Sequence, residues 1–179
     1  DVNLVCFPGG GLRSARGFEA QRTAVYDVID GARLDGLITW ASTVGGALDP
    51  AAVAEYHQRF RPLPMVSLSQ LPGGFPAVSI DSYNGMRSAV IHLLETHGFR
   101  RIALLRGPEG HYYAQERFRA YVYVLREYGI PYEPALVSPP MHWEAGAEAV
   151  RVLLEERALR AGIDFQALVL NNETRAAVM

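Results

Sequence analysis

Short apolar runs alternate with stretches of helical periodicity along the chain. The runs have the length of buried β-strands, and the stretches between them are long enough for helices that cover a sheet. The strand-like runs are residues 2–7, 36–40, 65–68, 102–105 and 167–170, with a weaker run at 135–137. This alternation predicts an α/β fold in which parallel sheets are flanked by helices and right-handed crossovers join neighbouring strands.

Capping residues and glycines mark where several helices begin and end. Asp49 followed by Pro50 is typical of a helix start, and either Asp81 or Ser82 can cap the long helix that stops at Gly98. Further helices are expected from apolar positions at helical spacing within residues 18–29, 118–125 and 146–157.

The alternation is interrupted near the middle of the chain. Prolines and glycines fill residues 70–75, and residues 77–80 form a short extended segment in place of a long core strand. This pattern indicates a crossing between two lobes, residues 1–80 and residues 81–179. The chain opens in a buried strand and stops without a closing element, so we expect both lobes to be partial and the fold to be incomplete at both ends.

Composition excludes several functions. A net charge of -2 and a pI of about 6.2 do not provide the basic surface that nucleic-acid binding requires, so these residues are not expected to bind DNA. All 17 basic residues are arginine, which excludes a Schiff-base lysine and the lysine of a phosphate-binding loop. No stretch approaches the ~20 apolar residues of a membrane span, and no membrane partner is expected.

The sequence also lacks motifs for a metal, a cofactor or a nucleophile. The five histidines are dispersed and no pair shows H-E-x-x-H or cysteine-rich spacing, and the glycines at 9–11 do not form a G-x-G-x-x-G pattern. Ser14 and Ser42 lack the G-x-S-x-G context of a hydrolase. We therefore expect no cofactor and no enzymatic activity. Cys6 lies in an apolar run and is expected to be a buried, inert thiol.

Four segments carry a more specific combination of motifs. They read VSIDSYNGMRSAVIHLLETHG, RRIALLRGPEG, AQERFRAYVYVLREYGI and ALVLNNETRAAVM. These segments contain, in order, an Asp or Asn pair after an extended crossover, a helix ending in His-Gly, a strand ending in Gly-Pro and an arginine opening the next helix. The combination resembles the ligand-binding core of LacI/GalR-type transcriptional regulators over residues 36–179, and residues 2–7 resemble the second strand of that fold.

The resemblance implies a two-lobed, periplasmic-binding-protein-like fold and a sensor function. A small polar ligand, such as a sugar or a nucleoside-like molecule, would bind between the lobes and signal by closing them. The resemblance further implies a homodimer in the cytoplasm that contacts DNA through a headpiece outside these residues. The first strand and helix of the fold would precede Asp1, and the last strands of both lobes would follow Met179.

Departures from the family pattern leave the ligand class open. Glu173 replaces the usual aspartate, and Arg175 occupies a normally apolar position. Met141 and His142 stand where many relatives present an aromatic wall to the ligand, which makes Met141 a candidate ligand-binding residue.

Arg117 is the strongest candidate for a ligand-binding residue. A guanidinium beside a strand-end loop offers a planar fork of donors to hydroxyls or a carboxylate, and the family resemblance implies the same position. The alternative is a solvated helix arginine, or an ion pair with Glu116 or Glu109.

Three further polar candidates lie next to predicted element ends. Asp81 and Asn84 follow the crossover and could face a polar ligand, although helix capping is the favoured role for Asp81. Asn84 matches a family ligand contact. Asn172 ends a strand, where its amide could donate to and accept from a ligand hydroxyl or instead form a local turn bond.

Aromatic candidates complete the set. Trp40 ends a strand and could stack on a sugar ring or a base, but core packing is the favoured role. His111, Tyr112 and Tyr113 form a loop that could close over a ligand or contribute to a dimer surface.

Three other functions remain open at this point. A transport-type solute-binding protein shares the fold and would carry a signal peptide upstream. A sensor domain fused to a kinase or diguanylate cyclase is similar in the opening segment. An enzyme of flavodoxin-like or Rossmann-like architecture would need a convergent acid, base or nucleophile, because the fold alone does not decide function.

Overall fold

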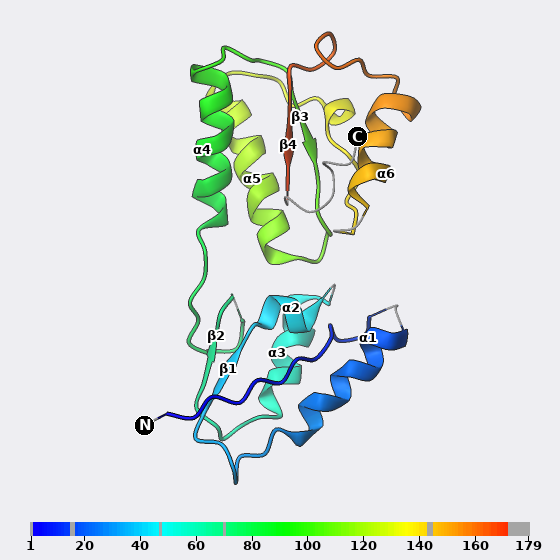
Figure 1. Ribbon diagram of the computed structural model, residues 1–179. Coiled ribbons are helices and arrows are strands. Elements are labelled where there is room, and N and C mark those ends of the chain that lie inside the picture. Colours follow the sequence, from blue (N-terminus) through cyan, green and yellow to red (C-terminus); the bar gives the residue numbers. More distant parts are fainter. Residues whose placement is uncertain (1, 15–16, 47, 70, 143–144, 172–179) are drawn as a thin grey trace. The chain divides into compact units, whose positions relative to one another are not determined.

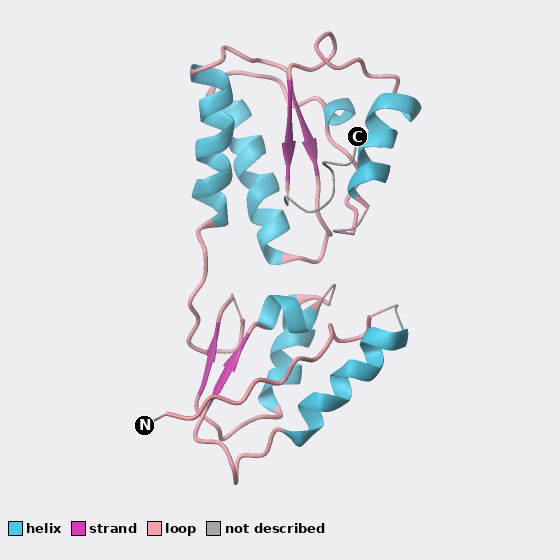
Figure 2. Ribbon diagram, in the orientation of Figure 1, coloured by secondary structure: helices cyan, strands magenta, loops and turns pink. Residues whose placement is uncertain are grey.

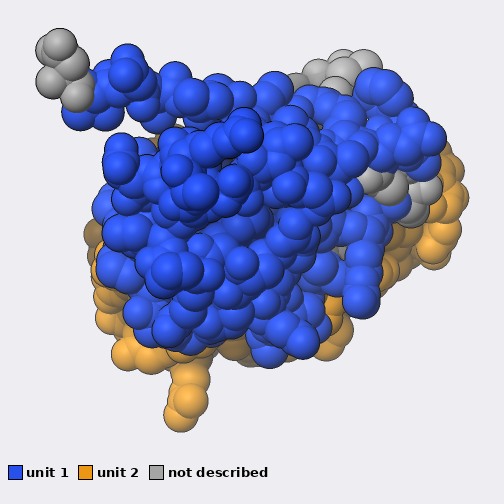
Figure 3. All heavy atoms as spheres, turned by 90° about the horizontal axis from the view of Figure 1, so that it is seen from below, with its two compact units in different colours: residues 1–80 blue, residues 81–179 orange. Residues whose placement is uncertain are grey.

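The chain divides into two compact units. The computed structural model describes residues 2–14, 17–46, 48–69, 71–142 and 145–171. Unit 1 is Asp1–Ile80 and unit 2 is Asp81–Met179 (Figure 3). Both units contain parallel strands flanked by helices, so the predicted α/β class is confirmed (Figure 1).

Unit 1 is built on a small parallel sheet. Strand β1 (Leu37–Thr39) pairs with β2 (Met65–Ser67), and Ser67 also forms a parallel bridge with Ala77. The expected extended segment at residues 77–80 is thus reduced to one bridge. The helices of unit 1 are α1 (Gly17–Arg22), a 3-10 helix η1 (Thr23–Val28), α2 (Ala41–Gly45) and α3 (Pro50–Gln58).

The start of α3 follows its sequence signal. The carboxylate of Asp49 accepts from the backbone N–H groups of Ala51 and Ala52, both at 3.0 Å, and Pro50 occupies the first turn. Apolar residues of α2, α3 and β2 then form the core of unit 1. That core contains Ala41, Val53, Ala54, Met65 and Leu71.

Three expectations for residues 2–29 of unit 1 are wrong. Residues 2–7 are not a strand, because among the described residues no strand pairs with them, and extended backbone needs such a neighbour for its hydrogen bonds. Cys6 is exposed instead of buried, because its segment is not part of a sheet core in the described structure. The expected helix over residues 18–29 is divided into α1 and the tighter turns of η1.

Unit 2 contains a longer parallel pair. Strand β3 (Ile102–Leu105) pairs with β4 (Ala167–Leu170) in the register Ile102 opposite Ala167, and Leu104 bridges Val137 on the other side. The helices are α4 (Ser82–Glu95), α5 (Tyr112–Glu127), a 3-10 turn η2 (Pro134–Leu136), α6 (Gly146–Arg151) and a π-helical turn η3 (Val152–Glu156).

Alternating side chains of β3 divide unit 2 into three layers. Ile102 and Leu104 enter a core shared with α4 and α5, whereas Ala103 and Leu105 enter a second core with α6 and η3. Figure 2 shows the same arrangement, with α4 and α5 on one side of the strands and α6 on the other. Both faces of β3 are therefore buried, which explains its unbroken apolar sequence.

Two elements of unit 2 differ from expectation. Residues 135–137 were expected as a strand, but Pro134–Leu136 forms a 3-10 turn in which the N–H groups of Leu136 and Val137 bond to the carbonyls of Glu133 and Pro134. Only the bridge at Val137 remains extended among the described residues. The expected helix over residues 146–157 changes from α to π geometry after Arg151.

Tyr121 joins α5 to the sheet through a buried hydrogen bond. Its hydroxyl donates to the carbonyl of Ile102 at 2.8 Å, and the side chain is 1% exposed. We expect Tyr121→Phe to lower the free energy of unfolding by about 1–2 kcal/mol, because the carbonyl is left without this donor. Urea unfolding measures the change. Tyr123→Phe, at an exposed position of the same helix, is the control, and equal effects of both variants would contradict the prediction.

Candidate functional site

Polar side chains gather at the carboxyl ends of the parallel segments of unit 2. Arg106 follows β3, Asn171 follows β4, and Ser138 follows the bridge at Val137. The backbone N–H of Arg106 donates to the Ser138 hydroxyl at 2.9 Å, and the backbone N–H of Asn171 donates to the Leu105 carbonyl at 3.2 Å. Ligand sites of open α/β sheets lie at this edge, so this cluster is the candidate site.

Arg117 connects three elements at this edge. Its Nη1 donates to the backbone carbonyl of Asn171 and, at 3.2 Å, to the Asn171 Oδ1 atom. Its Nη2 lies 3.4 Å from the Ser82 hydroxyl at the start of α4. The partly buried guanidinium therefore lies between α4, α5 and the end of β4, in the second turn of α5 instead of at its first residue.

The carboxylates considered as partners for Arg117 pair with other arginines. Glu109 accepts from Arg106 at 2.9 Å, and Glu116 accepts from Arg119 at 2.8 Å. Arg117 itself hydrogen-bonds to Asn171 and Ser82.

Asn171 is a site residue that sequence reasoning missed. It is 5% exposed, and its Nδ2 donates to the carbonyl of Ala114 at 3.2 Å while its Oδ1 accepts from Arg117. The amide thus fixes the guanidinium against both β4 and α5. The predicted site residue Asn172 lies outside the described residues; the signal for Asn171 was its place in the same Asn-Asn pair at the strand end.

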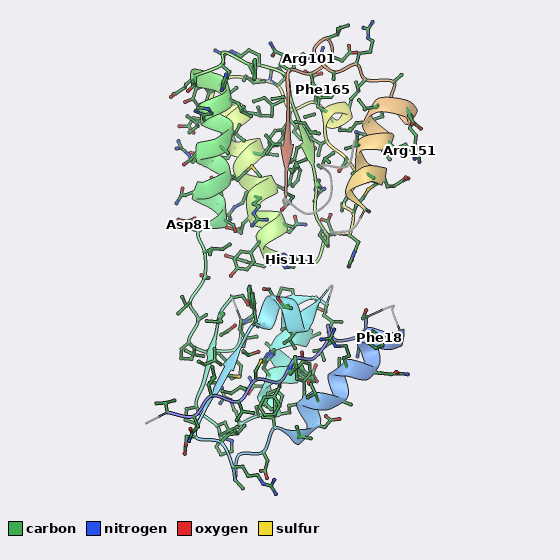
Figure 4. The ribbon with its side chains drawn as sticks, viewed as in Figure 1. Phe18, Asp81, Arg101, His111, Arg151 and Phe165 are labelled. Carbon is green, nitrogen blue, oxygen red and sulfur yellow. The ribbon has the colours of Figure 1, made fainter. Side chains whose placement is uncertain are left out.

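Asp81 and Asn84 bond to each other at the start of α4. The Asp81 carboxylate accepts from the backbone N–H of Asn84 at 3.0 Å and from its Nδ2 at 2.7 Å. These bonds confirm Asp81 as the helix cap and hold the pKa of its carboxyl below the ordinary value. Both side chains are exposed, and Asp81 lies at the same end of unit 2 as His111 (Figure 4).

His111 precedes α5 and lies near Arg117. Burial lowers the pKa of its imidazole, and the positive charge of Arg117 lowers it further. The ring lies 5.9 Å from that of Tyr113, which is buried, whereas Tyr112 is exposed. Both effects favour the neutral form of the imidazole.

Arg106 is a second cation at this edge that the sequence did not single out. Its guanidinium carbon lies 3.9 Å from the centre of the Phe118 ring, and its Nη2 bonds to Glu109 at 2.9 Å. The stacking and the ion pair hold the side chain on α5. Its place directly after β3 was the available signal.

The last two candidates occupy different surroundings. Trp40 follows β1 in unit 1 and is 60% exposed, so the favoured interpretation as a packed core residue is wrong. Ile38 and Trp40 are both exposed, and the buried Thr39 lies between them. Buried and less buried residues alternate in β2 in the same way. Met141, in unit 2, is partly buried against the core of β3 and α6.

Two further properties of the described residues bear on the class of site. No group of three or more potential metal ligands occurs in the part of the chain that the structure describes. Over the same part, every helix is too short or too polar to span a lipid bilayer.

Comparison with known proteins identifies relatives. No family model matches the chain. The regulator CelR of Thermobifida fusca is 32% identical over 156 residues, which are 79% of this chain and 44% of CelR. The repressor CytR of Escherichia coli K12 is 29% identical over 136 residues, 75% of this chain and 38% of CytR. The chain spans less than half the length of these curated relatives.

Solved structures agree with the sequence relatives. A LacI family transcriptional regulator from Mycobacterium smegmatis superimposes with a TM-score of 0.65 at 28% identity, covering 87% of this chain and 54% of that chain. A complex of the regulator CelR with cellobiose gives a TM-score of 0.61 at 29% identity, covering 86% and 44%.

The fold is thus the periplasmic-binding-protein-like α/β fold of LacI-family regulator domains. More specifically, the chain is related in sequence and fold to the ligand-binding domains of LacI-family regulators. These matched relatives are transcriptional regulators and not enzymes.

Proposed function

We propose that the chain is part of the ligand-sensing domain of a LacI-type transcriptional regulator and binds a small polar molecule. The observation that carries the proposal is the Arg117 guanidinium held by Asn171 at the end of β4 and by Ser82 at the start of α4. A fork of fixed donors in this position suits hydroxyl, carbonyl or carboxylate groups. The complex of CelR with cellobiose makes a sugar the first ligand class to test, with nucleoside-like molecules second.

The remaining parts of the proposal follow the family. Unit 1 and unit 2 would be partial lobes, and a ligand with higher affinity for their closed arrangement would shift the population towards it. The whole protein would act as a cytoplasmic homodimer and contact DNA through a headpiece outside these residues. Asn84, Asp81, Trp40, Met141 and Asn172 would be further ligand contacts.

Each alternative function requires a feature that distinguishes it from a transcriptional regulator. A transport-type protein would carry a signal peptide, a sensor of a kinase or cyclase would be fused to that output, and an enzyme would turn over its ligand. The transcriptional-regulator relatives favour the first proposal over all three.

A thermal-shift screen tests the proposed function. The intact protein is melted with cellobiose, other sugars, nucleosides, purines and small acids, because a ligand that binds the folded state raises Tm by mass action. We expect Arg117→Ala to abolish the shift of the active compound. Arg119→Ala is the matched control, since Arg119 is an exposed arginine of the same helix paired with Glu116.

The outcomes separate binding from folding. The Tm of each variant without ligand shows whether the loss of the bonds to Asn171 destabilises unit 2. A shift that survives in Arg117→Ala would place the ligand site elsewhere. The absence of any active compound would favour a ligand-independent interaction module.

A further inference from the structure

Two histidines meet on the surface at the C-terminal end of α4. The Nε2 atoms of His92 and His97 are 3.2 Å apart, and the two rings are nearly perpendicular, at 82°. Both side chains are exposed. Four residues separate the two histidines, which is within the spacing of zinc-binding histidine pairs. The two rings meet because the chain turns back immediately after the helix, where the N–H of Phe99 donates to the carbonyl of Leu93.

The distance between the two nitrogens matches two ligands of one metal ion. Imidazole nitrogens bind Zn²⁺ at roughly 2.0–2.1 Å, so two of them at a tetrahedral angle are about 3.3 Å apart. With the metal absent, the same distance allows one ring to donate a hydrogen bond to the other. Metal binding then requires the Nε2 atom that carries the proton to release it to solvent or to pass it to its own Nδ1 by a change of tautomer, so that both Nε2 lone pairs are available to the cation.

Neighbouring groups orient both rings. The Thr96 hydroxyl lies 3.1 Å from Nδ1 of His92, so it can accept the Nδ1 proton and leave Nε2 available as a ligand. His97 stacks on Phe99 with a centroid distance of 5.3 Å and an interplanar angle of 20°. The partial negative charge of a helix C-terminus also favours a cation at this place.

We propose that His92 and His97 form a binding site for a divalent transition-metal ion, with Zn²⁺ and Ni²⁺ as the expected occupants. Imidazole suits these ions, whereas Mg²⁺ prefers oxygen ligands. The protein supplies two ligands and water completes the coordination, because the described residues form no group of three or more potential ligands. Exchangeable, moderate-affinity binding is expected from such a site.

The metal site is separate from the candidate ligand site. His92 and His97 lie at the C-terminal end of α4, whereas Asp81 and Ser82 lie at its N-terminal end, near Arg117. The proposal therefore does not rest on the proposed sensor function, and either one can fail without the other.

Isothermal titration of the intact, untagged protein with ZnCl₂ or NiCl₂ tests the site. We expect saturable binding of one ion, which is lost in His92→Gln and in His97→Gln. Thr96→Val is expected to weaken binding roughly tenfold, because it removes the group that orients His92. His142→Gln, at an exposed histidine outside the pair, is expected to bind the metal as the wild type does.

Control measurements distinguish a loss of metal binding from a loss of folding. Circular dichroism establishes that the glutamine variants are folded, which their exposed positions lead us to expect, and MgCl₂ should give no binding. The proposal is overturned if the wild type shows no saturable Zn²⁺ or Ni²⁺ binding. It is equally overturned if binding survives in both single histidine variants.

Discussion

Leu104→Ala is expected to destabilise unit 2 by about 2–5 kcal/mol, the range for removing a large aliphatic side chain from a packed core. Leu104 is 0% exposed and packs with residues of α4 and α5. Its carbonyl also accepts from the N–H of Ser138 at 2.9 Å, so the same residue supports the edge of the candidate site. The loss is a large fraction of the stability of an ordinary domain.

Urea unfolding measures this effect. Ile163→Ala, at an exposed apolar position of unit 2, removes a similar volume without opening a cavity and should change the midpoint little. A small effect of Leu104→Ala, close to that of the control, would contradict the packing described for β3.

Lowering the pH from 7.5 to 5.5 is expected to destabilise unit 1 through His57. This side chain is 1% exposed, with Nδ1 2.7 Å from the carbonyl of Val53 and Nε2 2.9 Å from the hydroxyl of Thr39. A carbonyl can only accept, so Nδ1 carries the proton and Nε2 accepts from Thr39. The neutral imidazole therefore satisfies both partners.

The sign of the pH dependence follows from the pKa. Burial lowers the pKa of His57 below its ordinary value of 6.5, and the hydrogen bond to Val53 offsets only part of this effect. Between the lowered folded pKa and the unfolded pKa, the unfolded chain binds a proton that the folded chain does not. The stabilising contribution is thus complete above the unfolded pKa and is lost as the pH falls towards the folded pKa.

A variant series separates the histidines. His57→Gln should reduce the dependence of the urea midpoint on pH, whereas His142→Gln, at an exposed position, should retain it. His111 in unit 2 contributes in the same direction, because its pKa is lowered by burial and by Arg117. We therefore expect the double variant of His57 and His111 to show the weakest pH dependence. An unchanged slope in that double variant would refute the assignment.

The sequence predicted only part of the candidate site. Arg117 was selected because of its place after a strand-end loop, and the structure places its guanidinium at the carboxyl edge of the strands. Its partners Asn171 and Ser82 could not be predicted, because they lie 54 and 35 residues away along the chain. Arg106 was missed because a single arginine after a strand has no distinctive spacing.

Local features of the sequence determined many of the elements of this protein, though not all. The apolar runs at β1 to β4 and the caps Asp49 and Asp81 act within a few residues, so periodicity and hydrogen-bonding capacity predict them directly. The parallel α/β class follows from their alternation.

Tertiary structure decided everything that depends on a distant neighbour. Residues 2–7 have strand-like composition, but a strand exists only where another strand satisfies its backbone. The exposure of Cys6 and Trp40 and the bonds of Asn171 to Arg117 each depend on how the chain returns on itself. Such contacts have no signature in spacing, because chain folding and not sequence separation sets the distance between the groups.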